Sequence, residues 1–428
     1  MLSSTPKRSI CRPAARVAVC SLLAASGGAQ AQMCEGDAVF EGSGAASWFD
    51  PVWSPRPIGP FGSIVTDPPT PGERAVFDMP GIVLHNSGTG EPTAICGLLA
   101  HGQADVTLSI FESLLLTGEG LEVRAPNLDV LLAIENVLPD SMLETPSILL
   151  TAASDTSARL ELLPSSAPST GIVLRSVNGV PQGSVSIGPA GRASALIDGA
   201  SVQMFPGYAV DTVIGGEAGS DGLLSIVNGA SVELFGSSLT VGQFGTGQID
   251  VAGSQLVTQS ITGAILGFQS GSVGRVTVTQ GGVWVANGRM IEVGAFGRGR
   301  LVVTETSDVD SPGGVLVPSG GEVSLTGTIT GDVTAAGGEI RLFGSGDFES
   351  ELTSRIAGAL MLSGQSPRRG VFAPGRLSVR VDSVGAPGTA GVASSLRVDM
   401  VEFDGTLRII APASLQPAVG DEIHIVDA

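Results

Sequence analysis

Apolar and polar residues alternate in short runs along most of the chain, most clearly between residues 220 and 305. Apolar pairs separated by one residue recur there, namely Leu224/Ile226, Ile249/Val251, Val276/Val278 and Leu301/Val303. The residues between them are Ser225, Asp250, Thr277 and Val302. Successive side chains of a β-strand point to opposite faces, so each pair shares one face. The pattern predicts half-buried strands that end at turns such as Asn228-Gly229, Asp198-Gly199 and Gln280-Gly281.

Glycine divides these strands into copies of one unit. The stretch "LTVGQFGTGQIDVAGSQLV" (residues 239–257) is one copy, and the first glycines of the copies are Gly188, Gly215, Gly242, Gly267 and Gly294. A fixed period of this length is typical of a solenoid, because stacked units bury the apolar face that one unit cannot bury alone. Glycine accepts the positive φ angles that sharp, stacked corners require. The loops "GQFGTG" and "GGEAGSDG" differ in length, which predicts one corner of variable length.

The fold class that follows is all-β. We predict a parallel β-helix (β-solenoid) with irregular N-terminal coils and a C-terminal β cap region. At ~4.8 Å per coil, about ten coils make a rod of roughly 50 Å. The 61 glycines and the 4% of aromatic residues fit a narrow interior filled by Val, Ile, Leu and Ala.

The stretches "VGQFGTGQIDVAGSQLV" and "LGFQSGSVGRVTVTQGGVWV" carry a family resemblance. They resemble the glycine-rich repeat associated with autotransporter (type V secretion) passengers and PEP-CTERM proteins of Gram-negative-type bacteria. The match covers residues 185–305, and "GEVSLTGTITGDVTAAGGEIRLFGSG" (residues 321–346) resembles the closing coils of such proteins. The resemblance implies a parallel β-helix, export and a surface or extracellular setting.

Four segments are expected along the chain. Residues 1–31 are typical of a signal peptide, with basic residues from Lys7 to Arg16, a short apolar core at 17–25 and cleavage after Ala31. Residues 32–103 form an N-terminal cap with a proline-rich part, 104–346 the solenoid, and 347–428 a C-terminal β region. The chain ends at "HIVDA" without a membrane barrel or a sorting signal, so it is either simply secreted or truncated.

The net charge and the cysteine content of the chain limit the partners that are expected and indicate how its cysteines pair. The formal net charge is −19, and loss of the signal peptide removes four further positive charges. Nucleic acid and anionic membranes are therefore not expected partners, and the mature chain contains no apolar run long enough to span a membrane. In an oxidising compartment Cys34 and Cys96 most simply form one disulfide, and the alternative is two free thiols.

Candidate chemistry is sparse. His85, His101 and His424 are isolated, and the mature chain has no lysine. The only candidate metal site is a Ca²⁺ site at Glu305, Asp308 and Asp310, for which a solvated loop is the plainer interpretation. We expect Trp48 and Trp53 to pack over the open end of the solenoid rather than bind sugar, and Arg298 and Arg300 to be exposed at a corner. The orientation of Trp284 stays open.

The function expected from these observations is a secreted or cell-surface, non-enzymatic β-solenoid with a structural or adhesive role and no cofactor. It would lie outside a Gram-negative-type cell or in its periplasm, and extracellular glycans or surface proteins are the expected partners. The alternatives are a polysaccharide-active enzyme or carbohydrate-binding module on the same fold, and the passenger of a truncated autotransporter. A cluster of carboxylates and arginines on one face of adjacent coils would favour the enzyme.

Overall fold

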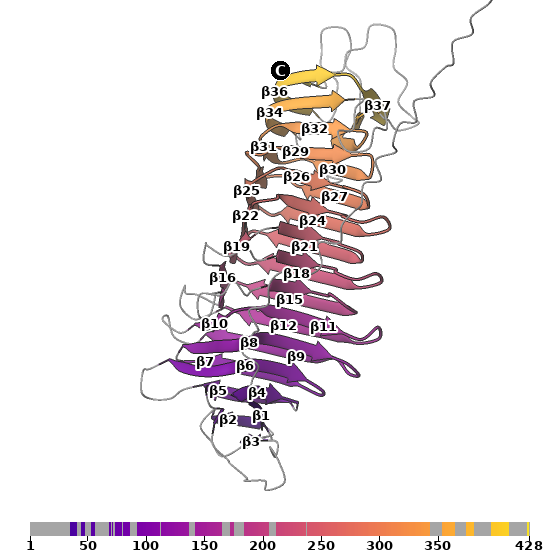
Figure 1. Ribbon diagram of the computed structural model, residues 1–428. Helices are drawn as coiled ribbons and strands as arrows, with labels where there is room; N and C mark the ends of the chain where they lie inside the picture. The colour runs from indigo at the N-terminus through magenta and orange to yellow at the C-terminus, as the bar shows by residue number, and fades with distance from the viewer. Residues whose placement is uncertain are drawn as a thin grey trace, which may run out of the picture.

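In the computed structural model the chain winds into a long stack of parallel strands (Figure 1). The structure describes residues 35–40, 44–47, 53–55, 68–69, 71, 73–78, 80–85, 92–111, 113–136, 142–164, 172–174, 184–204, 211–236, 238–342, 353–363, 374–380, 395–410 and 426–427. These residues contain 38 strands in two sheets, of 24 and 14 strands. The predicted all-β parallel solenoid is therefore confirmed.

Each regular coil contributes three strands, which we assign to faces 1, 2 and 3 in chain order. Face 1 contains β1 (Gly36–Phe40), β4 (Glu73–Phe77), β11 (Ile148–Ala152), β14 (Ser184–Ile187), β17 (Asp211–Ile214), β20 (Ser238–Val241), β23 (Ala264–Leu266), β26 (Ile291–Val293), β29 (Val315–Pro318) and β32 (Val333–Ala336).

Face 2 is the 14-stranded sheet. It consists of β2 (Gly44–Ser47), β5 (Gly81–His85), β7 (Asp105–Ile110), β9 (Val130–Asn136), β12 (Ser157–Leu163), β15 (Arg192–Asp198), β18 (Asp221–Val227), β21 (Thr246–Ala252), β24 (Val273–Thr279), β27 (Arg298–Val303), β30 (Gly321–Leu325), β33 (Glu339–Leu342), β35 (Arg376–Arg380) and β37 (Thr406–Ile410). Fourteen strands at the usual spacing span roughly 60 Å, somewhat more than the sequence estimate.

Face 3 contains β10 (Leu143–Thr145), β13 (Ile172–Leu174), β16 (Ser201–Met204), β19 (Ser231–Gly236), β22 (Gln255–Ser260), β25 (Val283–Gly288), β28 (Asp308–Asp310), β31 (Thr328–Thr330) and β38 (Val426–Asp427). Four longer strands run from face 3 into face 1, namely β6 (Thr93–His101), β8 (Leu114–Ala125), β34 (Thr353–Ser363) and β36 (Ser395–Phe403). β3 (Trp53–Pro55) pairs antiparallel with β1.

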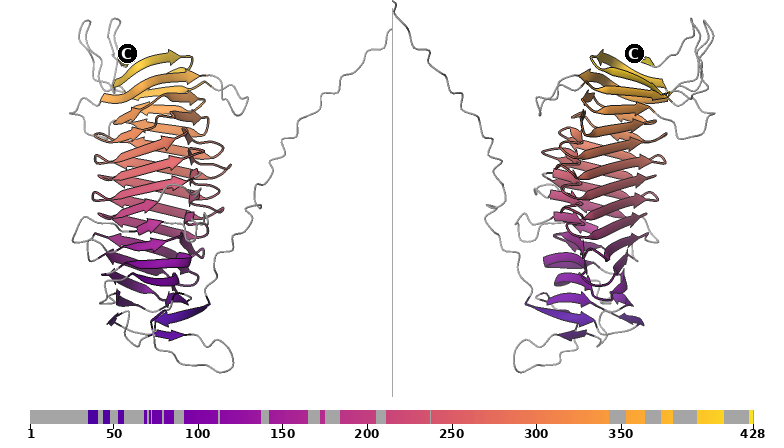
Figure 2. Two further views of the ribbon diagram at one scale, coloured as in Figure 1. Left: turned by 60° about the vertical axis from the view of Figure 1, so that its left-hand side comes forward. Right: turned by 90° about the vertical axis from the view of Figure 1, so that its right-hand side faces the viewer.

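Parallel pairing extends through the segments expected to be a cap and a C-terminal region. β1 pairs with β4 and β4 with β6 within residues 32–103. Beyond residue 346, β35 pairs with β33 and β37 pairs with β35. The stack is continuous in all the views of Figures 1 and 2. The irregular coils at both ends therefore use the same strand-on-strand packing as the repeats.

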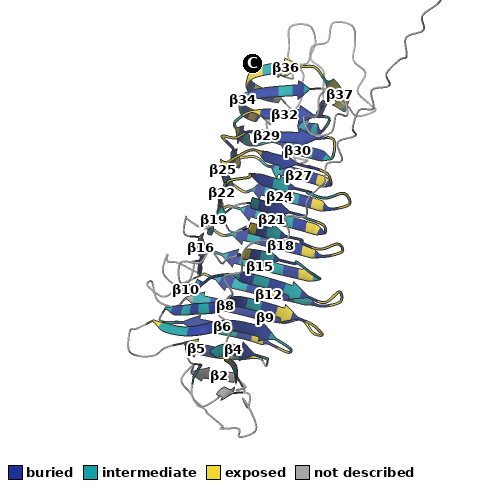
Figure 3. Cartoon of the chain, viewed as in Figure 1, coloured by how far each residue is buried: buried dark blue, intermediate teal, exposed yellow. Residues whose placement is uncertain are grey.

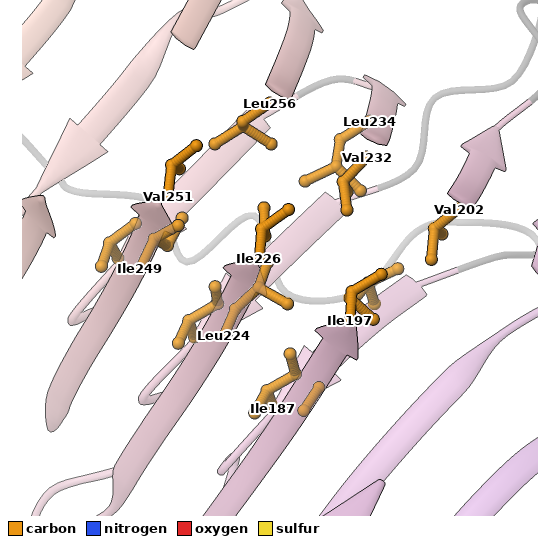
Figure 4. Close-up of a cluster of buried hydrophobic side chains, with 14 of the residues drawn as sticks. Ile187, Ile197, Val202, Leu224, Ile226, Val232, Leu234, Ile249, Val251 and Leu256 are labelled. Carbon is orange, nitrogen blue, oxygen red and sulfur yellow. The ribbon is translucent and has the colours of Figure 1, made fainter. Parts of the chain in front are cut away.

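The interior is a ladder of aliphatic side chains. The alternating pairs expected to share a face, from Leu224/Ile226 to Leu301/Val303, are all buried, and Figure 3 shows the strands as mostly buried and the turns as exposed. In register, Ile197 lies beside Ile226, Ile226 beside Val251 and Val251 beside Val278. Figure 4 shows such side chains from successive coils pointing into the same interior. Each coil thus covers the apolar face of its neighbour.

Glycine occupies the two places at which the backbone demands it. The first glycine of every repeat copy has a positive φ, as predicted; for Gly242 it is 71°. A second glycine stands at the start of face 2, where a Cβ on Gly247 would lie 2.2 Å from the carbonyl oxygen of Ile214. Register stacks these second glycines in one column: Gly222, Gly247, Gly274, Gly299, Gly321, Gly338, Gly375 and Gly405. The column allows backbone to pack on backbone at this corner.

Candidate functional site

Charged side chains converge on the outer side of face 2, toward the C-terminal end of the stack. Register places Arg300 beside Glu322, Glu322 beside Glu339 and Glu339 beside Arg376, so strands β27, β30, β33 and β35 contribute one column. The next column along the strands holds Ser324, Arg341, Ser378 and Arg408. β27, β30 and β37 are labelled in Figure 1 near the orange and yellow end.

A chain of ion pairs joins these columns. Arg341 bridges the two carboxylates, with Nη1 3.0 Å from Oε2 of Glu322 and Nη2 3.0 Å from Oε2 of Glu339. Arg300 Nε lies 3.1 Å from Oε1 of Glu322. Arg376 and Arg408 approach Glu339 only to 4.0 Å. Two adjacent glutamates, which would repel each other alone, are thus held together by the arginine between them.

Burial and hydrogen bonds set the protonation of the pair. Burial raises the pKa of the Glu339 carboxyl, but hydrogen bonds from Arg341 and Ser378 and the charges of Arg341 and Arg376 outweigh it, so the pKa lies below its ordinary value of 4.5. The hydrogen bond to Glu339 raises the pKa of Arg341 above its ordinary value, against the opposing effect of burial. Both groups therefore stay charged at neutral pH.

A groove adjoins the columns because the corner between faces 1 and 2 shortens. The corner is residues 267–272 after β23 and 294–297 after β26, but only Ser319 and Gly320 after β29, and Gly337 and Gly338 after β32. The groove has a volume of about 580 Å³. Its charged lining is Arg298, Arg300, Glu322, Glu339 and Arg376. The predicted corner of variable length is confirmed, and its shortening leaves the hollow.

The groove region is locally basic on an acidic chain. Arg298, Arg300, Arg341, Arg376 and Arg408 face only two carboxylates here, while the formal net charge of the chain is −19. The side chains of Arg300, Arg376 and Arg408 are about half exposed. Arg298 pairs with no acidic side chain within the described part of the chain. An anionic ligand would find several forked donors in one place.

The acid–base capacity of the Glu339–Arg341 pair is low. A general acid near neutral pH needs a carboxyl whose pKa is raised, and that of Glu339 is lowered. A general base needs an accessible unprotonated group, but the lowered pKa makes the Glu339 carboxylate a weak base, and Arg341 stays protonated. The arrangement is suited to electrostatic binding.

The three acidic residues considered for Ca²⁺ do not form a ligand set. Asp308 and Asp310 flank the buried Val309 on β28 and so point outward from face 3, while Glu305 lies in the preceding turn. Among the described residues, no three His, Cys, Asp or Glu side chains are gathered closely enough to hold a metal ion.

Trp284 points inward. It is fully buried in β25, and its indole Nε1 donates a 3.0 Å hydrogen bond to Oγ1 of Thr258 in the preceding coil. Trp53 lies in β3, and Trp48 lies outside the described residues. Arg298 and Arg300 are exposed, as predicted, but the register makes them part of a groove rather than isolated corner residues.

Cys96, His85 and His101 are not among the residues that line this groove. Cys96 is buried in β6 and Cys34 lies outside the described residues, so their pairing stays a prediction. His85 and His101 lie in β5 and β6, and His424 is outside the described residues. No helix long and apolar enough to cross a membrane occurs in the described ranges.

Comparisons with known proteins identify no relative from which a function for the groove could be inferred. No family model matches the chain, no curated protein matches it, and no solved structure matches it. The likeness to autotransporter passengers and PEP-CTERM proteins therefore remains a resemblance of sequence pattern.

Sequence reasoning missed the groove, although a signal for it exists. From β18 onward, a glycine, one variable residue and an apolar residue stand at the start of each strand of face 2, as in "GRL", "GEV" and "GEI" at residues 299–301, 321–323 and 338–340. Aligning the strands on the glycine places the variable residues in one column: Leu223, Gln248, Arg275, Arg300, Glu322, Glu339, Arg376 and Thr406. The column becomes charged at Arg275 and stays charged through Arg376, and the strands beside the shortened corners lie within this charged part.

Proposed function

We propose that the protein is a secreted or cell-surface β-solenoid with a structural or adhesive role, which binds its partner without chemically changing it. The observation that carries this proposal is the groove on face 2, where Glu339 and Arg341 lock each other in their charged forms. Such groups bind well and exchange protons poorly. The basic, apolar and A-x-A parts of residues 1–31 support export of a Gram-negative-type protein.

The rigid stack supports a structural role. Every described strand of face 2 pairs in parallel with its neighbours, and the interior is a continuous aliphatic core. Backbone groups that are paired and buried resist proteolysis, which suits a protein exposed outside the cell. Repetition of one unit also presents the same surface position at regular intervals along the rod.

A polysaccharide-active enzyme is the second candidate, and one observation favours it. Glu322 and Glu339 stand on adjacent strands within a groove that also contains arginines, which is the arrangement expected of such an enzyme. The lowered pKa of Glu339 weighs against it, because glycoside hydrolysis needs one protonated carboxyl.

The test is a depolymerisation assay on purified protein. It is incubated with neutral and acidic polysaccharides, and new reducing ends and unsaturated ends are measured over time. We expect neither to form. Release of either product by the wild-type protein, and its loss in Glu339→Gln, would establish the enzyme instead. Mass spectrometry of the exported protein should show an N-terminus at Gln32, and retention of residues 1–31 inside the cell would contradict export.

A further inference from the structure

We propose that the groove on face 2 binds a linear acidic polysaccharide, with the groove arginines contacting its carboxylate or sulfate groups and phenylalanines of the adjoining corner contacting its sugar rings. This inference rests on the proposed function, because it names the ligand that the protein would bind without cleaving. It is carried by charge, by the spacing of the charges and by a row of exposed aromatic residues.

The groove contains more arginines than its carboxylates neutralise. Two carboxylates accept from Arg300 and Arg341 at 3.0–3.1 Å, while Arg376 and Arg408 remain 4.0 Å from Glu339. Arg298 lines the same groove and has no acidic partner within the described ranges. A guanidinium group binds a planar or tetrahedral oxyanion through two parallel hydrogen bonds, so these arginines fit carboxylates and sulfates.

The groove cations are distributed along the rod. Arg298 and Arg300 belong to β27, Arg341 to β33 and Arg376 to β35, and Glu322 on the intervening strand β30 is neutralised by Arg300 and Arg341. Neighbouring strands lie ~4.8 Å apart, so Arg298 and Arg376 are separated by roughly 14 Å along the rod. A small anion can meet only one or two of these groups, whereas a chain with several anionic units can reach all of them. The groove, of about 580 Å³, is open to such a chain rather than closed around a single ion.

A row of phenylalanines lies at the edge of face 2. Phe244 and Phe296 are 49% and 44% exposed, in a chain with few aromatic residues. Their loops stack with that of Phe268, because Phe268 N donates to Gly242 O at 2.9 Å and Phe296 N donates to Gly267 O at 3.4 Å. The rings of Phe268 and Phe296 meet edge to face with centroids 6.4 Å apart.

The row of phenylalanines lies next to the groove strands and favours a ligand that contains sugar rings. Phe296 lies in the corner between β26 and β27, two residues before Arg298, so the loop that carries this exposed ring leads into the first groove strand. A pyranose ring presents a flat apolar face with polar groups at its rim, and exposed aromatic side chains bind such amphipathic faces. An acidic peptide supplies the charges but no row of flat rings. The combination of arginines and stacked phenylalanines therefore favours an acidic polysaccharide.

The experiment measures binding by isothermal titration calorimetry with two matched pairs of polymers. Polygalacturonate is compared with its fully methyl-esterified form, and dextran sulfate with dextran; polyglutamate represents acidic peptides. The test variant is Arg298→Gln with Arg376→Gln, both exposed. The control is Arg192→Gln, because Arg192 stands in the same register column as Arg298, four strands away on β15. Circular dichroism checks that each variant folds.

We expect at least one acidic polymer to bind and its uncharged counterpart not to bind. The double variant should weaken binding by roughly tenfold or more, and Arg192→Gln should leave it unchanged. Phe244→Ser with Phe296→Ser should weaken binding of the polysaccharide but not of polyglutamate.

Three results would overturn the inference: no binding of either acidic polymer, equal binding of the uncharged polymers, or binding of polyglutamate as tight as that of the polysaccharides. None of them involves cleavage. Failure of the ligand assignment is therefore distinguishable from failure of the non-enzymatic proposal, which would appear as shortened polymer.

Discussion

Gly247→Ala should destabilise the solenoid more than Gly271→Ala, although only Gly271 has a positive φ, at 87°. An added Cβ at Gly247 would lie 2.2 Å from Ile214 O and 2.3 Å from Gly242 N. Ordinary contact distances would require the two coils to separate by about 1 Å, and neither neighbour is a side chain that could rotate away. At Gly271 nothing lies within 4 Å of the added atom.

The magnitudes follow from these contacts. Overpacking costs typically ~1–3 kcal/mol even where side chains can adjust. The same displacement strains the 2.7 Å hydrogen bond from Gly242 N to Ile214 O, worth about 1 kcal/mol. Gly247→Ala should therefore lower the free energy of unfolding by about 3 kcal/mol or more. Gly271→Ala should lower it by about 1 kcal/mol, because the left-handed conformation costs ~1–2 kcal/mol and reduced freedom of the unfolded chain offsets part of this.

The assay is urea unfolding followed by far-ultraviolet circular dichroism, with both variants and the wild-type protein measured at one concentration. We expect the midpoint of Gly247→Ala to be clearly the lowest. If Gly247→Ala unfolded at the midpoint of Gly271→Ala or above it, the column of glycines would not mark a backbone-on-backbone contact, and the explanation of the glycine content at this corner would be wrong.

Three further predictions concern single positions. Trp284→Ala should lower the free energy of unfolding by about 3–5 kcal/mol, because the indole is fully buried. Trp284→Phe should lower it by about 1–2 kcal/mol, because it leaves the Thr258 hydroxyl without the indole donor. Equal urea midpoints for the wild type and both variants would place the indole outside the core. Gln280→Gly should raise the melting temperature, because Gln280 has a φ of 56° and glycine adopts this left-handed conformation without the cost of about 1 kcal/mol that a side chain brings. A lower melting temperature would contradict this explanation. Glu339 has a lowered pKa, so the stability it contributes is present above the ordinary pKa of 4.5 and is lost as the pH falls through the folded-state pKa. The wild type should therefore have a higher free energy of unfolding than Glu339→Gln at neutral pH and lose this difference in acid. A difference that persisted in acid would argue against the ion pair with Arg341.

The fold could be predicted because its signals are local and repeated. Alternation at Leu224 and Ile226 identifies a strand with one buried face, and the recurrence of glycine at positions such as Gly215 and Gly242 identifies the corner. Each repeat gives the same information again, so an error in one copy is corrected by the next. The end coils lack the repeat pattern and yet pair in the same way.

The groove could not be predicted from residue spacing. Arg300, Glu322, Glu339 and Arg376 are unevenly spaced in sequence, because the corner and the connecting segments change in length from coil to coil, yet the register makes them neighbours. The orientation of Trp284, toward the interior or toward solvent, could not be predicted either. An aromatic residue can occupy either face of a strand, and the inward position depends on a hydroxyl from another coil, that of Thr258, pairing with the indole. Neighbours across coils require the register, which the sequence reveals only after the strands are aligned on their glycines.

The central claim is that the groove binds without catalysis, and one measurement tests it most directly. The protein is mixed with polygalacturonate of narrow size distribution and, after prolonged incubation, the sample is separated by size-exclusion chromatography with light scattering. The account predicts that protein co-elutes with polymer whose mass is unchanged. Polymer of lower mass would contradict the account and identify the carboxylates of β30 and β33 as the place to look for the chemistry.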